Sequence, residues 1–211
     1  MIKKAESFVR QVFAGDASGH DAEHTFRVYR LALTLAREEG ADPEITALAA
    51  LLHDVDDRKL SPDTAQGLLR ARGFLEAQGM EEYKIQQILT VISQISFRGT
   101  DSVVPTTAEG KCVQDADRLD AMGAIGIART FAYGGSRERP IYTPGEAPRL
   151  DMDGKTYESR TDGCSLNHFY EKLLLLKDRM NTESGKRLAR HRHQVLEEFL
   201  EEFLKEWEGE V

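Results

Sequence analysis

A strongly apolar stretch of the chain ends in one histidine and three aspartates. Positions 47–57 read ALAALLHDVDD, so a helix that ought to be buried finishes in His53, Asp54 and two further acids. At about 100° per residue, His53, Asp54 and Asp57 project from one side of the helix end. Such charge is costly unless it is compensated, and carboxylates with neutral imidazole suit divalent first-row metals. The pattern indicates a metal site, with a solvated or salt-bridged helix end as the alternative.

A second group of candidate ligands lies upstream, where positions 20–24 read HDAEH. His20 and His24 are four residues apart and share a helical face, but the glutamate is not in the position that HExxH metalloproteases need. Ser18 and Asp21 fit a capping box, which predicts that Asp21 reaches back to the amide of Ser18. His24 is therefore the better ligand candidate, and a hydrogen-bonded core histidine is the alternative.

A third acidic group lies at positions 115–120, which read DADRLD. In a helix, Asp117 and Asp120 share a face while Asp115 points nearly opposite to Asp117, so the three cannot all serve one site. Asp117, followed by Arg118, is the candidate for a fourth ligand. The alternative is an exposed charged turn.

His24, His53-Asp54 and Asp117 together resemble the H…HD…D signature of the HD superfamily of metal-dependent phosphohydrolases. The spacing also fits, since 28 residues separate the two histidines and 62 separate Asp54 from Asp117. The chain is similar over nearly its whole length to small bacterial HD hydrolases, in the segments GHD-x-x-H (19–24), ALLHD (50–54), ISF (95–97), QDADRLDAMGAIGIARTFAYGG (114–135), RPIY (139–142) and NHFYEKLL (167–174). This resemblance implies that His24, His53, Asp54 and Asp117 bind the metal.

The resemblance also implies roles for residues beside the ligands. Asp57, four positions after His53, would act on the attacking water, and Arg118 would contact phosphate. By charge and position, Lys59, Arg98 and Lys111 could hold a longer polyphosphate, although each could equally be a plain surface cation.

The four-ligand set admits manganese, iron, cobalt, nickel or zinc, whereas magnesium is less natural because it avoids imidazole. The sequence lacks the extra motifs of the cyclic-nucleotide phosphodiesterases and di-iron oxygenases, so a second metal is not expected.

Similarity to bacterial HD hydrolases of nucleoside and deoxynucleoside triphosphates implies a nucleotide substrate, attacked at phosphorus by a metal-activated water. A 5'-nucleotidase or other phosphomonoesterase is the alternative enzyme. A metal- or nucleotide-binding regulatory protein without activity is the alternative of another class. The segment 134–164, which carries several cations, could serve as a lid or could be an ordinary solvated loop.

The elements that must position these residues are predicted to be helices in a single all-α domain, 1–211. Apolar spacing and capping signals predict helices at 2–13, about 19–39, from Asp42-Pro43, from Ser61-Pro62 to near Gly79, at 81–95, after Thr106-x-x-Glu109, and at 121–133, 166–180 and 183–208. Residues 134–164 are rich in proline and glycine and are expected to form a loop or a small hairpin at Asp153-Gly154. The C-terminal helices, 165–211, are expected to pack on the core.

Composition narrows the class of protein. The 211 residues are 30% charged with a formal net charge of −8, which disfavours a partner such as a nucleic-acid polymer. The longest apolar runs are far shorter than the roughly 18 residues that a membrane span needs. Two isolated cysteines and an N-terminus without a continuous apolar core predict a cytoplasmic protein. The oligomeric state is left open, with a homodimer among the alternatives.

Overall fold

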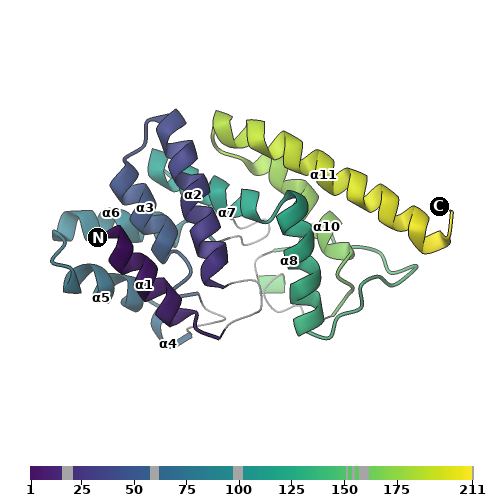
Figure 1. The fold of residues 1–211 in the computed structure, drawn as a ribbon, viewed down its shortest axis with the longest axis horizontal. Coiled ribbons are helices and arrows are strands. Elements are labelled where there is room, and N and C mark those ends of the chain that lie inside the picture. Colours follow the sequence, from purple (N-terminus) through teal and green to yellow (C-terminus); the bar gives the residue numbers. More distant parts are fainter. Residues whose placement is uncertain are drawn as a thin grey trace. The chain divides into compact units, whose positions relative to one another are not determined.

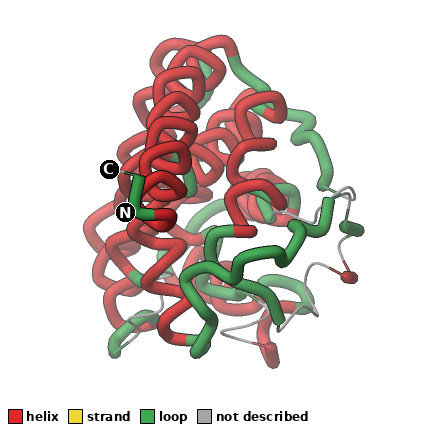
Figure 2. Tube along the Cα trace, turned by 90° about the vertical axis from the view of Figure 1, so that its right-hand side faces the viewer, coloured by secondary structure: helices red, strands yellow, loops and turns green. Residues whose placement is uncertain are grey.

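The computed structural model describes residues 1–15, 21–57, 62–96, 102–150, 152–153, 155–156 and 162–210. Within these ranges the chain forms helices joined by turns and loops, and no strand (Figure 2). The all-α prediction is therefore confirmed. The chain divides into two compact units: Met1–Phe97 with Val103–Asp117, and Arg98–Ser102 with Arg118–Val211. That these form one domain, with 165–211 packed on its core, stays a prediction.

The first unit is built from seven helices that Figure 1 labels along the N-terminal half of the chain, counting only described residues. They are α1 (Ile2–Val12), α2 (Ala22–Glu39), α3 (Pro43–Leu52), α4 (Pro62–Ala65), α5 (Leu69–Ala77), α6 (Glu82–Ser93) and α7 (Ala108–Asp120), the last of which ends three residues past the boundary of the unit.

Helix α3 forms the centre of the first unit. Every residue from Ile45 to Leu52 is buried, because α1, α2 and α6 all pack against this helix. A helix that is apolar all round can only be stable inside a core. The helix begins as predicted: the Asp42 carboxylate accepts hydrogen bonds from the amides of Glu44 and Ile45, and Pro43 occupies the first turn.

Two helix starts differ from the predicted capping boxes. Asp21 is itself the N-cap of α2, since its Oδ1 accepts from the amide of His24 at 2.8 Å; Ser18 and His20 lie outside the described residues. At α7 the cap is Thr107 rather than Thr106, because Thr107 Oγ1 accepts from the amide of Gly110. More than one short polar residue lies near each of these helix starts, so the sequence alone cannot choose which of them is the cap.

Two predicted helices are each divided in the structure. The segment from Ser61 to Gly79 contains α4 and α5, separated where Gly67 and Leu68 both adopt positive φ, 89° and 53°. The segment 166–180 contains α10 (Asn167–Glu171) and a 3-10 helix, η2 (Leu173–Arg179), which meet at Lys172. Apolar periodicity continues across both breaks, so it does not reveal them.

The second unit contains α8 (Gly123–Ser136), α10, η2 and α11 (Glu183–Glu208). Helices α8 and η2 both pack against the long α11, and Figure 1 labels α8 and α11. Aromatic rings fill this contact: the Phe131 ring centroid lies 5.9 Å from that of Phe169 and 5.8 Å from that of Phe199. Among the described residues, no helix has both the length and the apolar character needed to cross a membrane.

The described parts of segment 134–164 that follow α8 are loop, apart from residues 155 and 156, which are helical; the predicted hairpin at Asp153-Gly154 falls in part on residues outside the described ranges. The base of the loop is closed by two backbone hydrogen bonds, from Ser165 to the carbonyl of Pro140 and from Leu166 to that of Ile141. Gly134 allows this close approach, since a Cβ there would lie 2.0 Å from Ser165 Oγ.

Candidate metal centre

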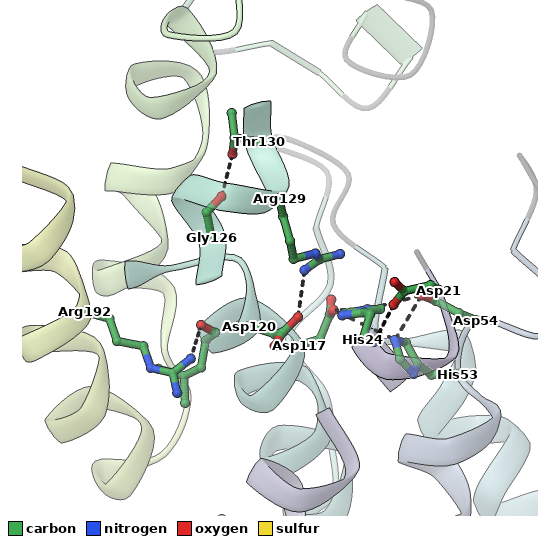
Figure 3. Close-up of polar contacts among 11 residues, drawn as sticks. Asp21, His24, His53, Asp54, Asp117, Asp120, Gly126, Arg129, Thr130 and Arg192 are labelled. Carbon is green, nitrogen blue, oxygen red and sulfur yellow. Dashed lines mark hydrogen bonds and ion pairs between the residues drawn. The ribbon is translucent and has the colours of Figure 1, made fainter. Parts of the chain in front are cut away.

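Three segments of the first unit bring two histidines and two aspartates together (Figure 3). His24 lies in the first turn of α2, His53 is the residue directly after α3, Asp54 follows it, and Asp117 comes from α7. Both imidazoles are buried, whereas the side chain of Asp117 is 27% exposed. The structure therefore brings these four residues together, and their role as metal ligands stays a prediction.

The distances within this His/Asp cluster are short. Asp54 Oδ2 lies 3.3 Å from Nε2 of His24 and 3.3 Å from Nε2 of His53. Asp117 Oδ1 lies 3.4 Å from Nε2 of His24 and 3.9 Å from Nε2 of His53. His24, His53 and Asp117 each offer one ligand atom, and these three atoms all lie within 4.8 Å of one another. Metal bonds of about 2.1 Å place neighbouring ligand atoms roughly 3.0–3.4 Å apart, so small shifts would accommodate a cation.

The ring of His53 is oriented by a hydrogen bond outside the cluster. Its Nδ1 lies 2.8 Å from the carbonyl oxygen of Ala50, which can only accept, so Nδ1 carries the proton. Nε2 is then the unprotonated nitrogen of the neutral ring, and it is buried without a hydrogen bond of acceptable geometry among the described residues. Metal-ligating histidines almost always donate their second ring nitrogen in this way. The donor set and its outer hydrogen bond fit a divalent cation.

Opposite charges stabilise the cluster in the absence of a metal. Burial by itself lowers the pKa of His53, but the neighbouring Asp54 and Asp117 outweigh it and raise that pKa above its usual 6.5. Burial would raise the pKa of Asp54, yet the two histidines hold it well below its ordinary value, and the pKa of Asp117 is lowered for the same reason. The two carboxylates therefore favour a positive charge at this position, which a divalent cation would supply.

Of the five other predicted site residues, the structure describes three. Asp57 is partly exposed in the turn after α3, and its amide donates to the carbonyl of Asp54 at 3.0 Å. Lys111 is partly exposed on α7. Arg118 is buried in the second unit, where one guanidinium nitrogen donates to the backbone carbonyl of Arg179. Lys59 and Arg98 lie outside the described residues.

Sequence reasoning missed two buried polar side chains of the first unit. Asp56 is 3% exposed and accepts hydrogen bonds from the amides of Arg70 and Ala71 at the start of α5. Gln114 Nε2 donates to the carbonyls of Gln94 and Val103 at 2.7 and 2.9 Å. Both residues bond to backbone far away in sequence, and a local pattern carries no signal for such partners. Asp115, from the same acidic group as Asp117, is also fully buried.

The helical fold and the buried His/Asp cluster define an all-α protein with a candidate metal centre of the HD type. A family model for the HD domain matches residues 21–122. The chain belongs to the HD superfamily and to its small bacterial branch, whose solved members include proteins described as HD-superfamily hydrolases.

Three relatives are similar over almost the whole chain. A crystal structure of a Lactobacillus plantarum protein is 41% identical with a TM-score of 0.86, over 98% of this chain and 96% of that one. A Bacillus thuringiensis HD-superfamily hydrolase is 43% identical with a TM-score of 0.75, over 99% and 97%.

The third relative is YpgQ of Bacillus subtilis, an uncharacterized protein that is 35% identical over 99% of this chain and 96% of its own length. The crystal structure of YpgQ in complex with ADP aligns over 99% of both chains with a TM-score of 0.79.

Proposed function

We propose that this hydrolase is a metal-dependent phosphohydrolase that acts on nucleotides, nucleoside and deoxynucleoside triphosphates in particular. The observation that carries the proposal is the convergence of His24, His53, Asp54 and Asp117, with His53 held in the tautomer of a metal ligand. The crystal structure of the relative YpgQ with ADP supports a nucleotide as the ligand class.

Each residue of the cluster has a role in this proposal. His24, His53, Asp54 and Asp117 hold the cation, for which manganese, iron, cobalt, nickel or zinc suits the mixed imidazole and carboxylate donors. When bound, a divalent cation supplies two effects: it lowers the pKa of water, and it polarises a phosphoryl oxygen.

The proton and the phosphate are handled by residues outside the ligand set. Asp57 lies in the turn that carries two of the ligands, where its carboxylate accepts the proton of the attacking water. Arg118 binds phosphoryl oxygens through its guanidinium, which also donates to the carbonyl of Arg179. Lys59, Arg98 and Lys111 contact the rest of the polyphosphate.

The test begins with elemental analysis of the purified full chain. The protein is then stripped with a chelator, and each of the five metals is restored before a hydrolysis screen with nucleoside triphosphates and phosphomonoesters. Pyrophosphate as the product from triphosphates supports the proposal, while activity limited to phosphomonoesters replaces it with a phosphomonoesterase. A metal-loaded protein that hydrolyses no member of the panel would overturn the enzyme assignment in favour of a binding protein.

A further inference from the structure

Helix α5 begins without a cap of its own. The residue before it, Leu68, adopts a left-handed conformation with φ of 53° and provides no side-chain hydrogen bond to the first turn. The two carboxylate oxygens of Asp56 supply these bonds instead, at 3.1 Å from the amide of Arg70 and 2.9 Å from that of Ala71. A buried carboxylate that accepts from two amides at a helix start is strongly held, since the bonds are charge-assisted and the helix dipole favours them.

Asp56 belongs to the same tight turn as two candidate metal ligands. The turn from His53 to Asp56 directs successive side chains to different surroundings: Asp54 to the His/Asp cluster, Val55 to the core, where it is fully buried, and Asp56 to α5. Two backbone hydrogen bonds close the turn, from Val55 to the carbonyl of Leu52 and from Asp57 to that of Asp54. The first of these is long, at 3.4 Å. The two bonds of Asp56 to α5 add an anchor outside the turn.

We propose that Asp56 is a positioning residue for the metal centre, because its bonds to α5 fix the turn that presents Asp54 and Asp57. This inference rests on the proposed function, since it assumes that Asp54 is a metal ligand. Residues that orient ligands typically change metal affinity or activity about 10- to 100-fold when they are replaced. Without its anchor the turn samples other conformations, and the carboxylate of Asp54 is no longer preorganised for the cation.

The chain offers a matched control in Asp42. Its carboxylate also accepts from two backbone amides at a helix start, those of Glu44 and Ile45 at 2.8 and 2.9 Å. It caps α3 at the end opposite to His53 and has no place in the proposed machinery. Asp42→Ala thus removes the same kind of cap without releasing the turn.

The experiment titrates cobalt into the metal-stripped full-length protein and records affinity, the visible absorption spectrum and the melting temperature. We expect Asp56→Ala to weaken cobalt binding at least tenfold and to alter the spectrum, which reports coordination geometry. Asp56→Asn should weaken cobalt binding less than Asp56→Ala does, since its Oδ1 can still accept one hydrogen bond. Its NH2 group, however, faces a backbone N–H and cannot accept the second. Asp42→Ala should lower the melting temperature but bind cobalt with the affinity and spectrum of the wild type.

The outcomes distinguish a failure of the positioning role of Asp56 from a failure of the metal centre itself. If Asp56→Asn, which is the variant more certain to fold, melts at a lower temperature yet binds cobalt as the wild type does, Asp56 is merely a helix cap and the inference is overturned. If the wild type binds no cobalt, or if His53→Ala binds it equally well, the metal centre itself is wrong and the proposed function fails with it.

Discussion

Replacing Asp117 tests the convergence of three helical segments on one cation. Asp117→Asn keeps the size of the side chain, and 27% of that side chain is exposed, so the neutral amide should be tolerated by the fold. Four-ligand zinc sites bind with roughly 10–16 kcal/mol of apparent free energy, and an equal share per ligand is about 3 kcal/mol. At about 1.4 kcal/mol per factor of ten, losing Asp117 should weaken binding roughly 100-fold.

This loss of affinity translates into a thermal shift. At a manganese concentration of about 100 times the wild-type Kd, binding stabilises the folded state by about 2.7 kcal/mol, which falls to about 0.4 kcal/mol for a variant with a 100-fold higher Kd. Since about 1 kcal/mol moves the melting temperature of a chain of this size by roughly 2–4 °C, the expected shifts are about 5–11 °C for the wild type and about 1 °C for Asp117→Asn.

The assay is a melting curve with and without manganese, with the exposed Asp178→Asn as a matched control. The control should retain the full shift. An Asp117→Asn protein that folds and is stabilised by manganese as strongly as the wild type would refute the placement of Asp117 among the ligands.

Three further outcomes are expected. Asp57→Asn should keep the metal content of the wild type and lose turnover by at least 100-fold, as expected for a general base; loss of metal as well would mean that Asp57 is a ligand. Because the pKa of His53 is raised above 6.5, its protonation stabilises the metal-free fold below pH 6.5, and this stabilisation is lost as pH rises through the raised pKa. The manganese-induced thermal shift should therefore grow from about pH 6 to about pH 8, and a shift that does not depend on pH would contradict this assignment. Asp120→Asn, which breaks a buried ion pair with Arg129 at 2.9 Å, should lower the free energy of unfolding by about 3 kcal/mol in urea titrations, whereas the exposed pair of Asp162 should matter little.

The helices and the cluster could be predicted because their signals are local or repeat at a fixed spacing. Apolar periodicity predicted α3 and its burial, and Asp42-Pro43 predicted where it begins. Because the end of this helix is buried, the polar side chains of His53 and Asp54 were expected to need a partner of opposite charge. The prediction of the complete ligand set depended on the family resemblance, which selected Asp117 over Asp115 and Asp120.

The features that could not be predicted depend on contacts between distant parts of the chain. Nothing near Asp56 or Gln114 in sequence indicates that these side chains bond to the backbone of another helix or loop. The break before α5 at Leu68 could not be predicted either. Leucine rarely adopts a positive φ, so the surrounding structure must hold Leu68 in this conformation. Capping patterns were ambiguous by one to three residues for a different, local reason, because more than one polar residue near a helix start can serve as the cap.

The order of the four proposed ligands along the chain has a consequence for protein synthesis. His24, His53 and Asp54 leave the ribosome well before Asp117, which is also the final residue of the first unit. A nascent chain shorter than this presents only three of the four groups, so a cation cannot be fully enclosed until α7 has emerged. Loading would then coincide with the completion of that unit, and the ion would hold together segments separated by as many as 92 intervening residues, which protects them against local unfolding and protease attack.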